Sequence, residues 1–180
     1  MFELKKTVAL VGMMGSGKSA IGKVVSSIID VPFKDADVEI EQAAKLSIPE
    51  IFERHGEKFF RDKEDQIIKR LLREKCCILA TGGGAFMNKK IRASIKEQGV
   101  SVWLNADLET LWKRVKHKRT RPLLRTHNPK ETLRSIYTDR IKTYSLADII
   151  VDSHDKSSLE EMAKLIIKSL LDRNDLIERA

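Results

Sequence analysis

The chain has 180 residues, 42% of them hydrophobic, with a formal net charge of +8 and a pI of about 9.5. This length suits one buried core, so we expect a single domain over residues 1–180. No apolar run approaches the roughly 18 residues that a membrane span needs, and the first six residues lack the basic and apolar regions of a signal peptide. We therefore expect a cytoplasmic protein without a membrane partner.

The positive charge is concentrated in one segment. Seven lysines or arginines and no acid lie between residues 113 and 125, whereas the rest of the chain mixes both signs. Such a cluster suits either nucleic acid or an anionic small molecule. No RNA-binding signature or aromatic-interleaved basic stripe accompanies it, so we expect it to neutralise phosphate groups and expect no nucleic-acid partner.

A glycine-rich segment at residues 12–19 sets the chemistry of the chain. It matches the phosphate-loop pattern G-x-x-x-x-G-K-[ST], and it lies between a predicted strand over 7–11 and a predicted helix over 20–29. Backbone N–H groups of such a loop and the following helix N-terminus bind phosphate oxygens. Lys18 can reach the β- and γ-phosphates, and the Ser19 hydroxyl can ligate Mg²⁺. The predicted nucleoside-triphosphate site comprises Gly12, Gly15, Ser16, Gly17, Lys18, Ser19 and Ala20.

Strands and helices alternate along the rest of the chain. Further strands are predicted over 31–35, 76–80, 100–104 and 148–151, and helices over 38–45, 48–54, 57–73, 88–98, 107–116, 129–144 and 158–171. Residues 118–128 are predicted to be a mobile loop and residues 173–180 a frayed tail. This alternation predicts an α/β fold with a parallel sheet covered on both faces and ligands at the carboxyl ends of its strands.

Five motifs, in this order, resemble those of shikimate kinases, a branch of the small P-loop kinases related to nucleoside monophosphate kinases. They are the phosphate loop, Asp35-Ala36-Asp37, Phe60-Arg61, Gly82-Gly83-Gly84, and Arg121-Pro122-Leu123-Leu124 followed by Arg140-Ile141-Lys142-Thr143-Tyr144. The resemblance implies a three-layer P-loop fold with a five-stranded parallel sheet, an acceptor-binding segment at about 37–64 and a mobile lid at about 117–127. It also implies transfer of the γ-phosphate of ATP to the 3-hydroxyl of shikimate, in the pathway to the aromatic amino acids.

The resemblance assigns the acceptor side of the site. Shikimate carries one carboxylate and three hydroxyls, which suit guanidinium groups and an acceptor of hydroxyl protons. Arg61 and Arg140 are similar to the carboxylate-binding arginines of the family, and Asp37 to the acid that holds the hydroxyls. Gly83 and Gly84 correspond to residues that lie against the ring. A further hypothesis makes Asp37 the general base.

The resemblance also assigns the donor side. Asp35 is implied to support Mg²⁺ beside Ser19, directly or through water, and Arg114 corresponds to the adenine-stacking arginine of the family. Arg121 resembles the lid arginine that reaches the transferring phosphates, where closure would also exclude water. The family is commonly monomeric, so we expect a monomer that uses ATP and Mg²⁺.

Two other functions remain open from the sequence. A gluconate kinase or another small-molecule kinase would share the phosphate loop, since the loop identifies the donor and not the acceptor. A nucleotide-dependent nucleic-acid-binding protein would use the basic segment, and would show salt-sensitive affinity.

Overall fold

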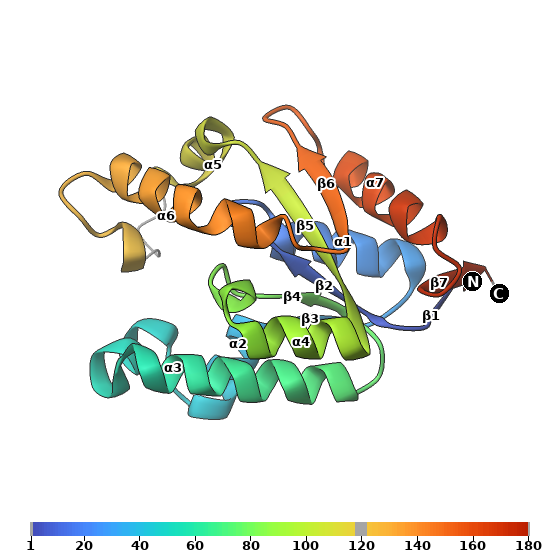
Figure 1. Ribbon diagram of the computed structural model, residues 1–180, viewed down its shortest axis with the longest axis horizontal. Helices are drawn as coiled ribbons and strands as arrows, with labels where there is room; N and C mark the ends of the chain where they lie inside the picture. The colour runs from blue at the N-terminus through green and yellow to red at the C-terminus, as the bar shows by residue number, and fades with distance from the viewer. Residues whose placement is uncertain (1, 118–121, 180) are drawn as a thin grey trace.

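The computed structural model of the chain describes residues 2–117 and 122–179. At its centre lies a five-stranded parallel sheet in the order β3-β4-β2-β5-β6, which confirms the predicted fold class (Figure 1). The strands are β2 (Thr7–Val11), β3 (Phe33–Asp35), β4 (Ile78–Ala80), β5 (Gly99–Ala106) and β6 (Ile149–Ser153). The chain runs from β2 to β3 on one side and later crosses β2 to reach β5. The phosphate loop therefore follows the strand at which the winding direction changes, where α/β sheets bind their ligands.

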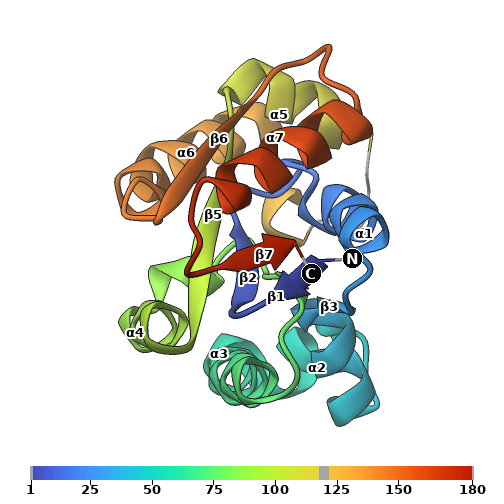
Figure 2. The same ribbon diagram turned by 90° about the vertical axis from the view of Figure 1, so that its right-hand side faces the viewer.

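Helices cover both faces of the sheet (Figures 1 and 2). They are α1 (Lys18–Ile29), α2 (Ala36–Ala44), α3 (Ile48–Arg73), α4 (Lys89–Gln98), α5 (Leu108–Val115), α6 (Pro129–Tyr144) and α7 (Leu159–Leu171). Val8 and Leu10 of β2 face the apolar cluster formed with α1 and α7. Ala9 and Val11 face the opposite cluster, which draws on α3, α4 and α6. Burial on both faces explains why β2 is apolar throughout.

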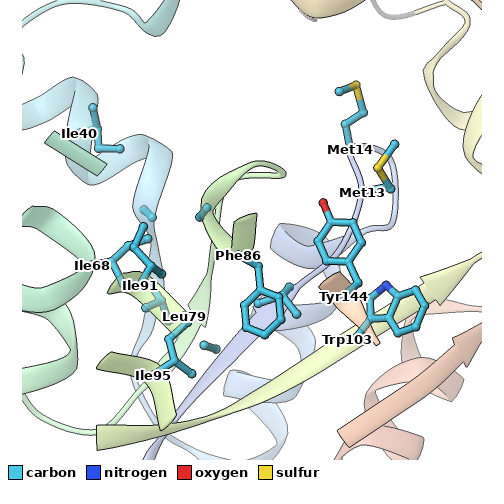
Figure 3. Packing of buried hydrophobic residues seen from close by; sticks show 14 of the residues in the cluster. Met13, Met14, Ile40, Ile68, Leu79, Phe86, Ile91, Ile95, Trp103 and Tyr144 are labelled. Carbon is cyan, nitrogen blue, oxygen red and sulfur yellow. The ribbon is translucent and has the colours of Figure 1, made fainter. Parts of the chain in front are cut away.

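An aromatic group in the second cluster supports the loop that follows β4 (Figure 3). The Tyr144 ring lies 5.9 Å from that of Trp103 and 6.5 Å from that of Phe86, between ring centroids. Figure 3 shows the Tyr144 hydroxyl pointing out of this group toward the side on which Met13 and Met14 lie. This hydroxyl donates a hydrogen bond to the Gly83 carbonyl oxygen. Burial raises the pKa of Tyr144 to about 12, so the phenol remains a donor at neutral pH.

The two helices predicted over 48–54 and 57–73 form the one long helix α3, which is interrupted at Gly56. That residue has φ 80° and ψ 173°, a conformation open essentially only to glycine. At the start of α3, the Ser47 side chain accepts from the Glu50 N–H, while the Glu50 carboxylate accepts from the Ser47 N–H. The predicted interruption between residues 54 and 57 and the predicted helix start at residue 48 are both confirmed.

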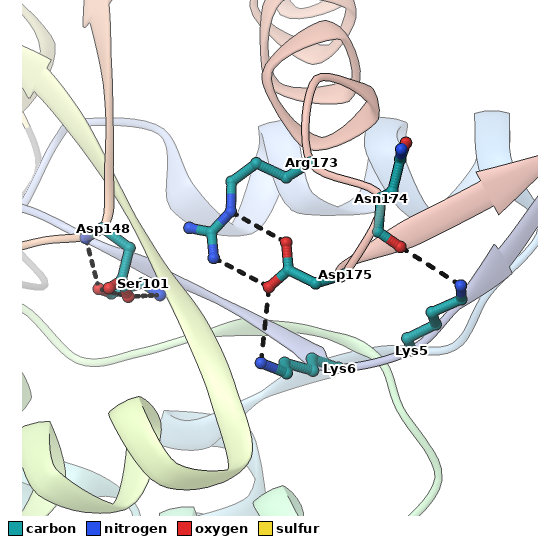
Figure 4. Close-up of polar contacts among 7 residues, drawn as sticks. All are labelled: Lys5, Lys6, Ser101, Asp148, Arg173, Asn174 and Asp175. Carbon is teal, nitrogen blue, oxygen red and sulfur yellow. Dashed lines mark hydrogen bonds and ion pairs between the residues drawn. The ribbon is translucent and has the colours of Figure 1, made fainter.

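The prediction of a frayed tail is wrong. Strand β7 (Ile177–Arg179) pairs antiparallel with β1 (Phe2–Leu4), and the two ends of the chain lie side by side (Figure 2). Leu176 and Ile177 are buried in the cluster that contains α1 and α7. Polar contacts join the same segments (Figure 4): Lys6 pairs with Asp175 at 3.6 Å, and Lys5 Nζ donates to the Asn174 carbonyl oxygen at 3.3 Å. Apolar burial and pairing with the other terminus order the tail.

Only part of the predicted loop over 118–128 can be compared with the structure, because residues 118–121 lie outside the described ranges. Directly after them, Pro122–Leu124 form a 3₁₀ turn, and the Leu124 side chain is buried. The prediction missed this turn, since a single buried leucine creates no periodicity. Mobility of the lid stays a prediction. Across the described ranges, every helix is too short or too polar to cross a membrane.

Candidate active site

The phosphate loop is shaped by glycines in the left-handed region. Gly15 and Gly17 have φ values of 82° and 91°, and a Cβ on Gly15 would lie 2.6 Å from Val115 Cγ1 of α5. Lys18 is nearly buried, and its ammonium donates to the carbonyl oxygens of Gly12 at 2.8 Å and Met13 at 2.9 Å. The loop therefore holds its lysine, the first residue of α1, against its own backbone at the N-terminus of that helix.

Ser19, Asp35 and Asp37 form one hydrogen-bonded chain between the loop and α2. The Ser19 hydroxyl donates to Asp35 Oδ2 at 2.6 Å, and the Asp37 backbone N–H donates to Asp35 Oδ1 at 3.0 Å. Asp35 thereby caps α2 and fixes the backbone position of Asp37 in its first turn. A serine hydroxyl beside a carboxylate is an oxygen donor set that suits Mg²⁺, the ion expected with ATP.

A cavity of about 500 Å³ opens over the phosphate loop. The predicted donor-side residues among its lining are Gly15, Gly17, Lys18, Ser19, Ala20, Asp35 and Arg114. Arg114 reaches from α5 to the end of β6, donating to the His154 carbonyl oxygen at 3.2 Å and to the Ser153 hydroxyl at 3.3 Å. Sequence reasoning missed this region, in which Ser153 ends β6 and the segment after the strand supplies Asp155 and Ser157 to the cavity. Its place after a strand was the one available signal.

A second cavity, of about 760 Å³, opens between α2, α3 and α6. All the predicted acceptor residues line it: Asp37, Arg61, Gly83, Gly84 and Arg140. Met14, Asp37, Gly82 and Gly83 line both cavities, so the two spaces meet between the phosphate loop, the start of α2 and the glycine run after β4. A group bound over the loop and a molecule in the second cavity would face each other there.

Arg61 is held in place by a buried acid that the sequence analysis missed. The Glu64 carboxylate, on a side chain only 1% exposed, accepts from Arg61 Nη1 through Oε2 at 2.8 Å. Burial raises the pKa of Glu64, whereas the charge of Arg61 acts in the opposite direction. In the sequence, the only sign of this pair is that Arg61 and Glu64 lie three residues apart on a predicted helix. The same spacing is equally common in exposed ion pairs on helix surfaces.

The glycine run after β4 lets these groups come close to the backbone. A Cβ on Gly84 would lie 2.7 Å from both terminal nitrogens of Arg61, and a Cβ on Gly82 would lie 2.8 Å from Glu64 Oε1. Because these glycines have no side chains, the Arg61 guanidinium and the Glu64 carboxylate pack directly against their backbone. A side chain at either position would displace them.

Two predicted donor residues, Ser16 and Gly12, are not among the residues that line the donor cavity. Ser16, a residue of the loop, is fully buried. Gly12 contributes the carbonyl oxygen that accepts a hydrogen bond from the Lys18 ammonium. Arg121 lies outside the described residues, so its predicted position over the phosphates is not tested. Arg125, four residues later, does line the acceptor cavity and was not predicted to do so.

Comparisons with known proteins agree with one another. A family model described as shikimate kinase matches residues 14–171. The chain is 54% identical to a shikimate kinase of Ruegeria pomeroyi over 97% of the chain and 90% of that protein. It is also 54% identical to one of Cereibacter sphaeroides, over 99% and 89% respectively. The solved shikimate kinase of Acinetobacter baumannii, in complex with shikimate, superimposes with a TM-score of 0.89 at 32% identity over 94% of each chain.

Proposed function

The chain belongs to the shikimate kinase family, and we propose that it transfers the γ-phosphate of ATP to the 3-hydroxyl of shikimate, giving shikimate 3-phosphate and ADP. It is an ATP-dependent kinase with a small-molecule acceptor. The observation that carries the choice of acceptor is the second cavity, where Arg61, Arg140 and Asp37 surround one space. Two guanidinium groups suit one carboxylate, and a carboxylate suits hydroxyl protons.

On the acceptor side, we propose that Arg61 and Arg140 bind the carboxylate of shikimate. Asp37 then accepts a hydrogen bond from a hydroxyl of shikimate and holds the acceptor oxygen toward the donor cavity, with Gly83 and Gly84 against the ring. Phosphoryl transfer passes through a loose transition state, so positioning and charge neutralisation contribute more than proton removal. Asp37 lines both cavities, which suits this positioning role and leaves its action as a general base a hypothesis.

On the donor side, we propose that the loop N–H groups bind the phosphates of ATP. Lys18 would leave the carbonyl oxygens of Gly12 and Met13 for the β- and γ-phosphate oxygens, and Arg114 would lie beside the adenine. Ser19 and Asp35 would hold Mg²⁺, which neutralises phosphate charge. Arg121 stays the predicted lid arginine, with the lid at about 117–127.

The remaining expectations are also proposals. We propose one domain over residues 1–180, with its acceptor-binding segment at about 37–64, that works as a monomer in the cytoplasm. The basic segment between 113 and 125 then serves phosphate chemistry, and neither nucleic acid nor a membrane is a partner.

A direct assay tests the proposed reaction. ADP release is followed with ATP, Mg²⁺ and, in separate reactions, shikimate, gluconate or a nucleoside monophosphate. We expect strong stimulation by shikimate alone. Stimulation by gluconate and not by shikimate would show a small-molecule kinase with a different acceptor. No stimulation by any of these acceptors would overturn the proposal.

A further inference from the structure

Glu64 is the most deeply buried acid of the acceptor cavity, and it is incompletely paired. Its Oε2 atom accepts from Arg61 at 2.8 Å, whereas its Oε1 atom is buried with no hydrogen-bond partner. A buried carboxylate oxygen without a donor is costly while the group is ionised. The ionised form of Glu64 therefore depends on the positive charges around it.

The charged side chains around Glu64, of both signs, come from several elements. The cavity that Glu64 lines contains four carboxylic acids and three arginines: Asp37 and Glu41 from α2, Glu57, Arg61 and Glu64 from α3, Arg125 from the segment after Pro122–Leu124, and Arg140 from α6. Tyr144 of α6 is also close to Glu64 but stays neutral, since burial raises its pKa to about 12. The Asp37 carboxylate lies close enough to Glu64 to repel its charge. Both acids approach the same side of Gly82: a Cβ on this glycine would lie 2.8 Å from Glu64 Oε1 and 3.0 Å from Asp37 Oδ1.

An anionic acceptor would change this balance. Its carboxylate would bind Arg61 and Arg140, the two cations that favour ionised Glu64. The cavity would then hold one more negative charge with the same arginines. A guanidinium group keeps its charge at neutral pH, and a free carboxylic acid is ionised well above its pKa of about 4. Glu64 is the group whose burial already favours the neutral form.

We propose that Glu64 takes up a proton from solvent when the carboxylate of the acceptor binds Arg61, so that acceptor binding and protonation of this buried acid are coupled. The inference rests on the proposed function. The reaction is one carboxylate plus one proton giving one carboxylic acid, with the buffer as the proton source. A proton on Oε1 would convert the orphaned acceptor into a donor beside the Asp37 carboxylate, which would remove the repulsion between the two acids.

Calorimetry measures this proton directly. Shikimate is titrated into the ATP-free chain at pH 7 in buffers of low and high ionisation enthalpy, such as phosphate and Tris. The slope of the observed binding enthalpy against buffer enthalpy gives the protons taken up, and we expect up to about one per shikimate. Absence of shikimate binding would contradict the proposed function, whereas binding with zero slope would overturn the proton coupling alone.

Two variants locate the proton. Glu64→Gln removes the titrating group, and we expect its slope to fall to near zero even though binding is weaker. Glu57→Gln is the matched control, because Glu57 contacts the same guanidinium at 3.5 Å but is 65% exposed. We expect its slope to match that of the unmodified chain. An unchanged slope in Glu64→Gln, or a lost slope in Glu57→Gln alone, would assign the proton elsewhere and overturn the proposal.

A spectroscopic measurement needs no variant. The unmodified chain is labelled with ¹³C-glutamate, and infrared difference spectra are recorded on adding shikimate. We expect a protonated-carboxyl C=O band to appear and carboxylate bands to decrease, both shifted by the label. A chain that binds shikimate without this label-sensitive band would contradict the proposal even if Glu64→Gln did not fold.

Discussion

At the scale of single residues, the acceptor cavity depends on guanidinium geometry as well as on charge. Arg61 presents two nitrogens toward Glu64 and Glu57 and packs flat against Gly84. A lysine would keep the charge but lose the planar fork, so it could not present two parallel N–H donors to one carboxylate while also contacting Glu64. The geometry of this cation therefore matters as well as its charge.

We expect Arg61→Lys to raise KM for shikimate by roughly tenfold to a hundredfold, the cost of one to two charge-assisted hydrogen bonds. KM for ATP should stay within about twofold, because Arg61 does not line the donor cavity. Steady-state kinetics with each substrate varied in turn measures both. Arg70→Lys is the control, since Arg70 lies on the same helix and lines neither cavity. Equal changes in the two variants would contradict a carboxylate-binding role.

Glu64 also makes stability depend on pH. Its pKa is raised in the folded state, chiefly by burial, so the folded chain holds this proton at pH values where the unfolded chain has lost it. The stabilisation is thus fully present below the unfolded pKa and is lost as pH rises through the folded pKa. We expect the free energy of unfolding of Glu64→Gln, measured with urea from pH 4 to 8, to fall less steeply with pH than that of the unmodified chain. Parallel curves would contradict the raised pKa.

The acceptor residues show what the sequence could and could not predict. Arg61 and Arg140 lie far apart in the chain, and no local pattern joins them; resemblance to a family predicted that they act together, and both line one cavity. Glu64 was missed because a glutamate on a helix is exposed by default. Its burial results from the close approach of the glycine run after β4, a tertiary contact with no local signal.

At the scale of elements, the phosphate loop and α5 are packed so tightly that they should act as one unit. A Cβ at Gly15 would collide with Val115 Cγ1 at 2.6 Å, on a helix that also carries Arg114 to the donor cavity. The position of the predicted adenine-side arginine therefore depends on the loop having a glycine there. Local signals had predicted both elements, but not their contact.

Two glycine variants separate backbone strain from this contact. Gly56 and Gly15 both have φ near +80°, but a Cβ on Gly56 would meet nothing within 4 Å. We expect Gly56→Ala to lower the free energy of unfolding by about 1–3 kcal/mol, the cost of the strained backbone. Gly15→Ala should lower it further and also raise KM for ATP, because Val115 must move. Urea unfolding and ATP kinetics test this, and equal stability losses with equal KM for ATP would contradict packing between loop and helix.

At the scale of the whole molecule, the alternation of strands and helices predicted the parallel sheet, but it did not predict the pairing of the two chain ends. Pairing of β1 with β7 joins the first and last described residues, and no periodicity in either segment signals it. The paired strands β1 and β7 lie on the side of the sheet that α1 and α7 cover, and their residues line neither cavity. Global stability and catalysis should therefore be separable in this chain.

Leu176→Ala tests this separation. Leu176 is fully buried beside β7, so the change removes a core side chain and should lower the free energy of unfolding by about 2–5 kcal/mol. Leu165→Ala, on the exposed face of α7 at 47% exposure, is the matched control and should change it by no more than about 0.5 kcal/mol. At temperatures where both variants stay folded, we expect kcat and both KM values to equal those of the unmodified chain. Lost activity in folded Leu176→Ala would mean that the joined ends shape the site; unchanged stability would mean that the tail frays after all.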